Sequence, residues 1–348
     1  MGKDRLKYFD LARGFAIWFM LMVHVVGELA TQEINLSVFG KTVEFLGGPP
    51  AAPVFMFLMG VFIALSKNFN LSSGIHRGLK VFLLGYLLNF LRGTLPVFLG
   101  LKLNLFSLDV VAPYTPSSLF WIVDILQFAG LALVFLSILR HFVCQRWVYI
   151  ALAIAITIVS PLLWGRVPDM PVLNQAFTLL WGVGGEAVAF PLFPWLVFPL
   201  GGIVYGNIFK QTPDKSRFFR RSLLVGSLFL LAGTFIILTD FDFHVGDYYR
   251  SGPGGVLWIC GFVMFVLWFC RVLVNFFGQN KVFSILYYWS SHITAFYFIH
   301  WILIGWFPFE EIDSVLVAIC VMLIVAVLTD LFTRGWIKGH KLLRQRTK

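Results

Sequence analysis

A small set of ionisable side chains interrupts segments of the sequence that are otherwise apolar: Asp10 with Arg13, His24 with Glu28, Asp124, and His300. Ionisable groups in apolar segments are costly, so each is a candidate functional residue. Imidazole and carboxylate groups are the usual general acids and bases near neutral pH. Their residue types therefore predict acid–base chemistry.

A second signal is the spacing between Arg13 and His24. The two residues are eleven positions apart, which is about 16 Å along a helix at 1.5 Å per residue. A cation that far from a buried histidine suits a long ligand with a phosphorylated head and a reactive tip. Coenzyme A has this shape, although other rod-shaped ligands fit the same spacing.

The composition determines which elements must hold these residues. The 348 residues are 59% hydrophobic and only 13% charged, with a mean hydropathy of +0.85. A soluble domain carries about 25% charged residues, so this chain could not cover a water-facing surface. Recurrent apolar stretches of about 20 residues predict an all-α, polytopic helix bundle in a lipid bilayer. No internal repeat or soluble segment is visible, and residues 1–348 are predicted to form a single domain.

Ten transmembrane helices are predicted, at residues 11–30, 52–66, 78–92, 119–139, 147–164, 191–209, 222–239, 254–272, 283–305 and 314–333. Placing both termini in the cytoplasm puts 22 of the 27 Lys and Arg residues on that side. This distribution obeys the positive-inside rule. The net charge of +10 therefore predicts orientation and not a nucleic-acid partner. We expect a prokaryotic cytoplasmic membrane.

The predicted helices place three polar residues at one depth. His24 lies about six residues from the outer end of the first helix, or roughly 9 Å. Asp124 lies five residues into the fourth helix and His300 about five from the outer end of the ninth, each at roughly 7.5 Å. Glu28 falls one turn beyond His24 on the same helix face. We expect an acid–base centre in the outer half of the membrane.

Other interpretations of the same residues stay open. Buried His300 and Asp124 are also typical of hydrogen bonds that only hold helices together, and Asp10–Arg13 of a salt bridge at a helix end. A proton-coupled transporter or flippase would use His24, Asp124 and His300 as a proton relay. A membrane scaffold is the third alternative. The four cysteines have no paired spacing, so neither a disulfide framework nor a metal site is predicted.

Five segments resemble known membrane acyltransferases. The segment RLKYFDLARGFA, followed by His24, resembles the first helix of these enzymes, including the acyltransferase-3 group. Four more segments resemble the heparan-α-glucosaminide N-acetyltransferase catalytic-domain family: AAPVFMFLMG at 51–60, ILQFAGLA at 125–132, FPLFPW at 190–195 and FYFIH at 296–300. The combination, in this order, separates that family from the acyltransferase-3 group.

This resemblance implies transfer of an acyl group, typically acetyl, from cytoplasmic acetyl-CoA to an acceptor, expected to be a sugar or glycan, on the far side of the membrane. Family members are thought to use a histidine near the first outer loop. Here residues 31–50 contain no histidine, Asn35 lies in that region, and His24 is the histidine nearby.

The expected roles follow from this resemblance together with the placement of the residues. His24 is the expected general base or acyl carrier, oriented by Asp124 or Glu28, with His300 and Tyr297 positioning the acceptor or stabilising the oxyanion. The phosphates of acetyl-CoA are expected near Arg13 and other residues at the inner face, namely Asp10, Arg77 and Lys80. Asn35, Tyr297 and Gln127 are the expected acceptor-binding residues. The expected partners are acyl-CoA, the acceptor, the lipid bilayer and a second copy in a homodimer.

Overall fold

The computed structural model describes residues 6–67, 69–166, 173–182, 188–306 and 311–346. These residues form helices and no strand; the only β-type contacts among them are two isolated bridges, Ala30–Ile312 and Val123–Val188. The predicted all-α fold is confirmed. Helices follow because apolar chain in lipid must satisfy its backbone hydrogen bonds internally.

Nine apolar stretches among the described residues are long enough to cross a membrane: Lys7–Leu29, Val38–Leu65, Leu71–Lys102, Ile125–Phe142, Arg146–Leu163, Leu192–Gln211, Lys215–Ile237, Pro253–Phe277 and Val315–Leu342. Each coincides with one of the ten predicted spans. The chain is therefore an integral membrane protein. The remaining prediction, 283–305, corresponds to two shorter helices.

That ninth predicted span is interrupted at His292, so the prediction of one continuous helix is wrong. Helix α16 (Lys281–Ser291) ends there and α17 (Ile293–Trp306) begins directly after it. The Ser291 hydroxyl donates to the carbonyl oxygen of Tyr287 at 2.7 Å, and the His292 ring Nδ1 lies 3.0 Å from the Tyr288 carbonyl oxygen. Polar side chains that bond to nearby carbonyls compete with the helical ladder.

Two connections predicted as loops are also largely helical. Residues 31–50 contain α2 (Gln32–Leu36) and α3 (Val38–Gly47). Residues 93–118 contain the end of a π-helical turn (Phe90–Thr94), then α6 (Leu95–Lys102), a short 3-10 turn and α7 (Pro116–Phe120). Apolar residues in both stretches favour continued helix over an exposed loop.

The chain divides into two compact units. The first comprises residues up to Ala51 together with those from Cys270 onward. In it, α1 (Lys7–Leu29) packs against α3, α16, α17 and α18 (Val315–Arg346). Gly14 allows the close approach of α16, since a Cβ atom there would lie 2.7 Å from the Leu286 Cβ.

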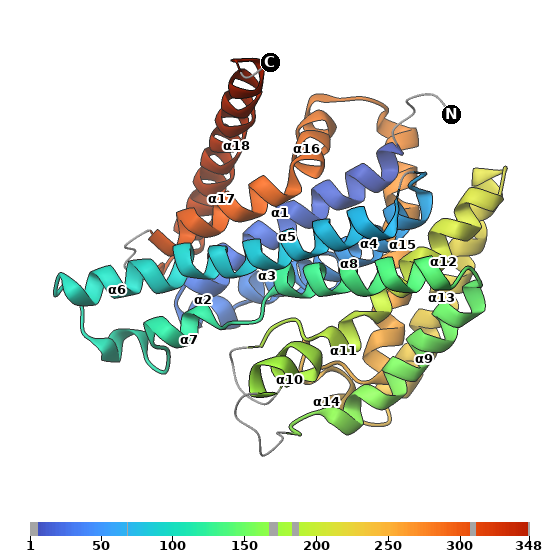
Figure 1. Cartoon of the computed structure of the whole chain (residues 1–348), viewed down its shortest axis with the longest axis horizontal. Coiled ribbons are helices and arrows are strands. Elements are labelled where there is room, and N and C mark those ends of the chain that lie inside the picture. The colour runs from blue at the N-terminus through green and yellow to red at the C-terminus, as the bar shows by residue number, and fades with distance from the viewer. Residues whose placement is uncertain (1–5, 68, 167–172, 183–187, 307–310, 347–348) are drawn as a thin grey trace. The chain divides into compact units, whose positions relative to one another are not determined.

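The second unit, from Ala52 to Phe269, contains the remaining helices: α4 (Ala52–Leu65), α5 (Leu71–Asn89), α8 (Ile125–Phe142), α9 (Arg146–Leu163), α10 (Asn174–Trp181), α11 (Leu192–Trp195), α12 (Val197–Gln211), α13 (Lys215–Ile237), α14 (Phe241–Val245) and most of α15 (Pro253–Phe277). Its main pairs are α4 with α12 and α5 with α8, the latter visible as neighbouring blue and green helices in Figure 1.

Candidate active site

Two polar layers lie along α1 in the first unit, and Arg13 belongs to one of them. Its Nη2 forms an ion pair with Asp10 Oδ1 at 2.7 Å, and its Nε donates to the Ser290 hydroxyl at 2.8 Å. The same hydroxyl is 3.2 Å from Asp10 Oδ1 and donates to it. Helix spacing of three residues places Asp10 beside Arg13, and α16 supplies Ser290. This arrangement agrees with the predicted salt bridge and adds a third residue.

Tyr287 extends this layer one turn before Ser290 on α16. Its hydroxyl oxygen is buried and has no hydrogen-bond partner in the part of the chain that the structure describes. Asp10 acts on it electrostatically. A buried hydroxyl without a partner is rare, because the desolvation cost is not repaid. This layer, the Arg13 layer from here on, therefore retains a hydrogen-bonding group that a ligand could use.

The other layer is a pair of histidines. His24 Nδ1 lies 2.9 Å from His300 Nε2, and the two rings are nearly parallel, with centroids 5.2 Å apart. His300 is fully buried, whereas His24 is half-buried. The indole of Trp301 lies 4.2 Å from the His24 ring, and the Tyr297 ring is 5.3 Å from His300. The expected grouping of His24, His300 and Tyr297 is present.

The hydrogen bonds of this pair define which nitrogens carry protons when both rings are neutral. His300 Nδ1 lies 3.1 Å from the Phe296 carbonyl oxygen, and a carbonyl can only accept, so this nitrogen carries the proton. His300 Nε2 then accepts the bond from His24 Nδ1–H. The basic lone pair of His24 is consequently on Nε2. A histidine fixed in this tautomer is suited to act as a base or nucleophile.

Helix α1 also sets the geometry between the two layers. Eleven residues separate Arg13 from His24, and at 100° per residue they return to within about 20° of the same helix face. The axial separation is about 16 Å. Helices α16 and α17 supply Ser290 to one layer and His300 to the other. One surface of α1 therefore presents both polar layers to the same segment of chain.

The other predicted site residues of the first unit lie at the end of α1 and in α2. Glu28 is exposed in the last turn of α1. Asn35 lies in the short helix α2 and not in a loop, and its amide nitrogen donates to the carbonyl oxygens of Ala30 and Thr31. Asn35 thereby caps the turn that follows α1. The bond that fixes the His24 tautomer comes from His300.

Asp124 belongs to the second unit, and its predicted position inside a helix is wrong. Helix α8 begins at Ile125, and Asp124 is its N-cap, accepting from the Ile125 backbone N–H at 2.7 Å. Its other oxygen forms an ion pair with Arg92 Nη2 at 2.7 Å. Gln127 completes a capping box by accepting from the Asp124 backbone N–H. Apolar sequence on both sides concealed the cap, which is a local structural feature.

Arg92 is a residue whose contribution the sequence pattern did not reveal. It lies in the π-helical turn that follows α5, a feature often found at functional sites, and it bonds to Asn89 Oδ1 as well as Asp124. Asn89 is buried and donates to the carbonyl oxygens of Phe120 and Ile122. These hydrogen bonds fix the backbone of the residues that directly precede α8. A single arginine within an apolar stretch was the available signal.

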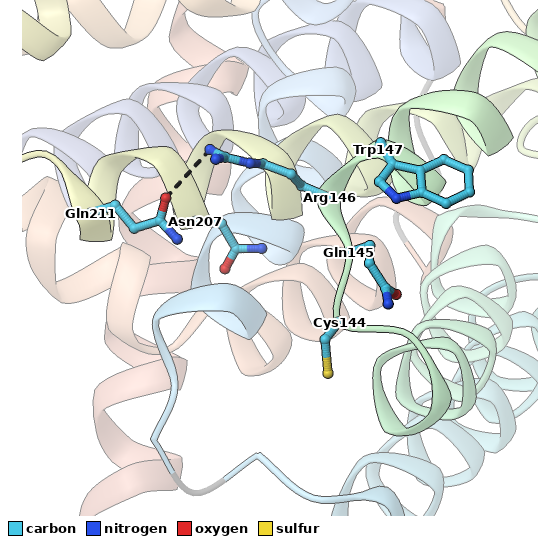
Figure 2. A pocket seen from close by; sticks show the side chains of 6 residues that line it. All are labelled: Cys144, Gln145, Arg146, Trp147, Asn207 and Gln211. Carbon is cyan, nitrogen blue, oxygen red and sulfur yellow. Dashed lines mark hydrogen bonds between the residues drawn. The ribbon is translucent and has the colours of Figure 1, made fainter.

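Arg77 and Lys80 lie on α5 and are both exposed. A polar cavity of about 360 Å³ lies elsewhere in the second unit and is lined by Cys144, Gln145, Arg146, Trp147, Asn207 and Gln211. Figure 2 shows Arg146 reaching toward Gln211, with which it makes a hydrogen bond of 3.3 Å. Among the described residues no group of three His, Cys, Asp or Glu side chains could hold a metal ion.

The apolar helices and the two polar layers define a membrane-embedded protein with a pair of hydrogen-bonded histidines among its helices. The family model for the catalytic region of heparan-alpha-glucosaminide N-acetyltransferase matches residues 5–233, and the chain belongs to this family. Membership implies a membrane acetyltransferase. A search of curated proteins finds no match. The family match contains Arg13 and His24, whereas Ser290 and His300 lie beyond it and join the site only through the fold.

Proposed function

We propose that the protein transfers an acetyl or other short acyl group from cytoplasmic acyl-CoA to an acceptor, a sugar or glycan, at the outer side of the membrane. The observation that carries this proposal is the His24–His300 pair, which leaves the basic lone pair on His24 Nε2. Family membership supplies the reaction class. A transporter has no comparable support, because that membership favours acyl transfer.

In this proposal the Arg13 layer lies toward the cytoplasmic face of the membrane and binds the phosphates of acyl-CoA. Arg13 supplies a guanidinium whose position is set by Asp10 and Ser290, and Tyr287 supplies a buried hydroxyl. Charge-assisted hydrogen bonds to phosphate are strong where water is partly excluded. The separation of about 16 Å along α1 leaves room for the pantetheine arm, so the thioester lies at His24.

Two routes lead from this complex to product. In the direct route His24 Nε2 takes the proton of the acceptor amine or hydroxyl, which attacks the thioester carbonyl carbon. The C–S bond then breaks, and the leaving CoA sulfur takes that proton from His24. In the covalent route His24 Nε2 itself attacks, the C–S bond breaks and CoA leaves as thiolate. The acceptor then attacks the acyl-imidazole and loses a proton. That proton converts the CoA thiolate into the thiol. In both routes His300 holds the Nδ1 proton of His24.

The proposal is tested by acetyl-CoA binding to the purified protein in detergent. We expect wild type to bind, Arg13→Ala to bind at least tenfold more weakly, which is about 1.4 kcal/mol, and His24→Ala to retain binding. His292→Ala is the matched control, because His292 lies between the layers on the same segment. Failure of folded wild type to bind acetyl-CoA would overturn the proposal and direct attention to transport assays.

The route is decided by incubating the protein with radiolabelled acetyl-CoA and no acceptor. Label retained by wild type and lost in His24→Ala indicates an acyl-histidine. Absence of label in a preparation that binds acetyl-CoA and acetylates a glucosamine probe indicates direct transfer. Label of equal strength in His24→Ala would exclude His24 as the acyl carrier.

A further inference from the structure

Helix α5 has two faces of opposite character. One face packs against α8 through glycines: a Cβ atom on Gly78 would lie 2.8 Å from the Gly130 carbonyl oxygen, and one on Gly85 would lie 2.7 Å from the Gln127 side chain. At 100° per residue, His76, Lys80, Leu83 and Leu87 project roughly 180° away from these glycines. The second face is therefore the one that α8 does not cover.

This uncovered face is hollowed into a groove of about 530 Å³, lined by His76, Leu79, Lys80, Leu83, Leu84 and Leu87. Three of its leucines are strongly exposed, with Leu79 at 52%, Leu83 at 65% and Leu87 at 46%. In a membrane protein such leucines face hydrocarbon. The groove is thus an apolar channel along one helix with two nitrogen-bearing side chains in its first half.

The dimensions of the groove match one leaflet of a bilayer. His76 and Leu87 are eleven residues apart, which is about 16 Å of helix, whereas the hydrocarbon core is about 30 Å thick. His76 lies at the end of the groove nearer the start of α5. Lys80 lies one turn further in, and a lysine at that depth extends its amine toward the interface.

From this groove we infer a binding site for an anionic phospholipid on α5. One acyl chain lies along Leu79, Leu83 and Leu87, and the headgroup phosphate is held by Lys80 and His76. The charge pattern carries the assignment, because the lining has Lys80 and His76 at one end, leucines along the rest and no carboxylate. Basic residues at a membrane interface attract anionic lipid.

The same charges disfavour a second copy of this chain as the occupant. A two-fold axis along the membrane normal would bring the same residues of both copies together at the same depth. Lys80 would then face Lys80, and like charges at short range are destabilising. A phospholipid phosphate neutralises that charge, whereas a symmetric helix pair concentrates it.

The test is native mass spectrometry of the intact protein with phosphatidylglycerol or phosphatidylcholine of identical acyl chains. Wild type should retain phosphatidylglycerol preferentially, and Lys80→Gln should weaken that retention about fivefold, the effect of one interfacial cation. Lys102→Gln, which removes another exposed lysine of the same apolar stretch, is the matched control and should change nothing. Elution volume and circular dichroism confirm that each variant is folded.

Four results would overturn the inference. Equal retention of the two lipids by wild type would show that no headgroup is recognised. An equal loss in Lys102→Gln would show a general charge effect. Displacement of phosphatidylglycerol by millimolar inorganic phosphate would indicate an anion site without an acyl-chain contribution. Crosslinking between copies through Leu83→Cys in bilayers, with no lipid preference, would assign the groove to a dimer instead.

Discussion

At the scale of single residues, His300 acts on the chemistry through His24. Substituting His300→Phe keeps an aromatic ring in the buried position but removes the Nε2 acceptor, so the His24 tautomer is no longer fixed. We expect the rate of acetyl transfer to fall about 10²-fold, the scale of general acid–base catalysis, with acetyl-CoA affinity unchanged within about threefold. Parallel binding and rate measurements check this. An unchanged rate would make His300 a packing residue only.

Tyr287 provides a second prediction at this scale. Because its buried hydroxyl has no partner among the described residues, Tyr287→Phe should leave thermal stability unchanged or raise it by about 1 kcal/mol. If that hydroxyl binds a phosphate of acyl-CoA, the dissociation constant should rise severalfold. Thermal unfolding with and without acetyl-CoA measures both quantities. Lower stability with unchanged affinity would contradict this role.

At the scale of helices, close backbone contact governs stability. Gly60 and Gly202 let α4 and α12 touch: a Cβ atom on Gly60 would overlap the Pro199 carbonyl oxygen, and one on Gly202 the Phe57 carbonyl oxygen. We expect Gly202→Leu to destabilise the protein by about 1–3 kcal/mol or more, as overpacking does. Gly27→Ala is the control, since nothing lies within 4 Å of that site. It should be neutral or stabilising. Thermal unfolding in detergent compares the two.

The cap of α8 separates a structural role of Asp124 from a catalytic one. Asp124→Asn keeps an effective N-cap but removes the negative charge that pairs with Arg92. Asp124→Ala removes the cap and the ion pair together. The alanine variant should therefore be less stable by about a further 1 kcal/mol, the usual contribution of a cap. Per folded molecule, both variants should bind acetyl-CoA and transfer acetyl as wild type does. Loss of transfer in a fully folded Asp124→Asn protein would restore the proton-relay interpretation.

At the scale of the whole molecule, the charge distribution predicts orientation. Basic residues surround the connection between α12 and α13, and acidic residues follow α13. With both termini cytoplasmic, a cysteine at Ser216→Cys should react with a membrane-impermeant reagent only in inverted vesicles. Thr239→Cys should react only in right-side-out vesicles. The background lacks the exposed Cys144 and Cys320. The reverse pattern would refute the predicted topology and the cytoplasmic origin of the acyl donor.

The sequence by itself determined the fold class and most of the membrane spans, because hydropathy acts locally and lipid requires helices wherever the chain is apolar. It also singled out Arg13, His24 and His300, since ionisable side chains are conspicuous in apolar surroundings. The family resemblance came from short motifs along the chain and agrees with the match over residues 5–233. Each of these features is readable from neighbouring residues.

Only the tertiary structure decided how these residues pair. His24 and His300 are 276 positions apart, and no local pattern says which nitrogen faces which. Ser290 joined Arg13 because Gly14 allows α16 to approach. Asp124 became a cap because the backbone needs an acceptor where α8 begins, and α16 ends at His292, whose ring Nδ1 lies beside the Tyr288 carbonyl oxygen. The pairings of His24 with His300 and of Arg13 with Ser290 depend on packing between distant segments, where contacts of similar energy compete.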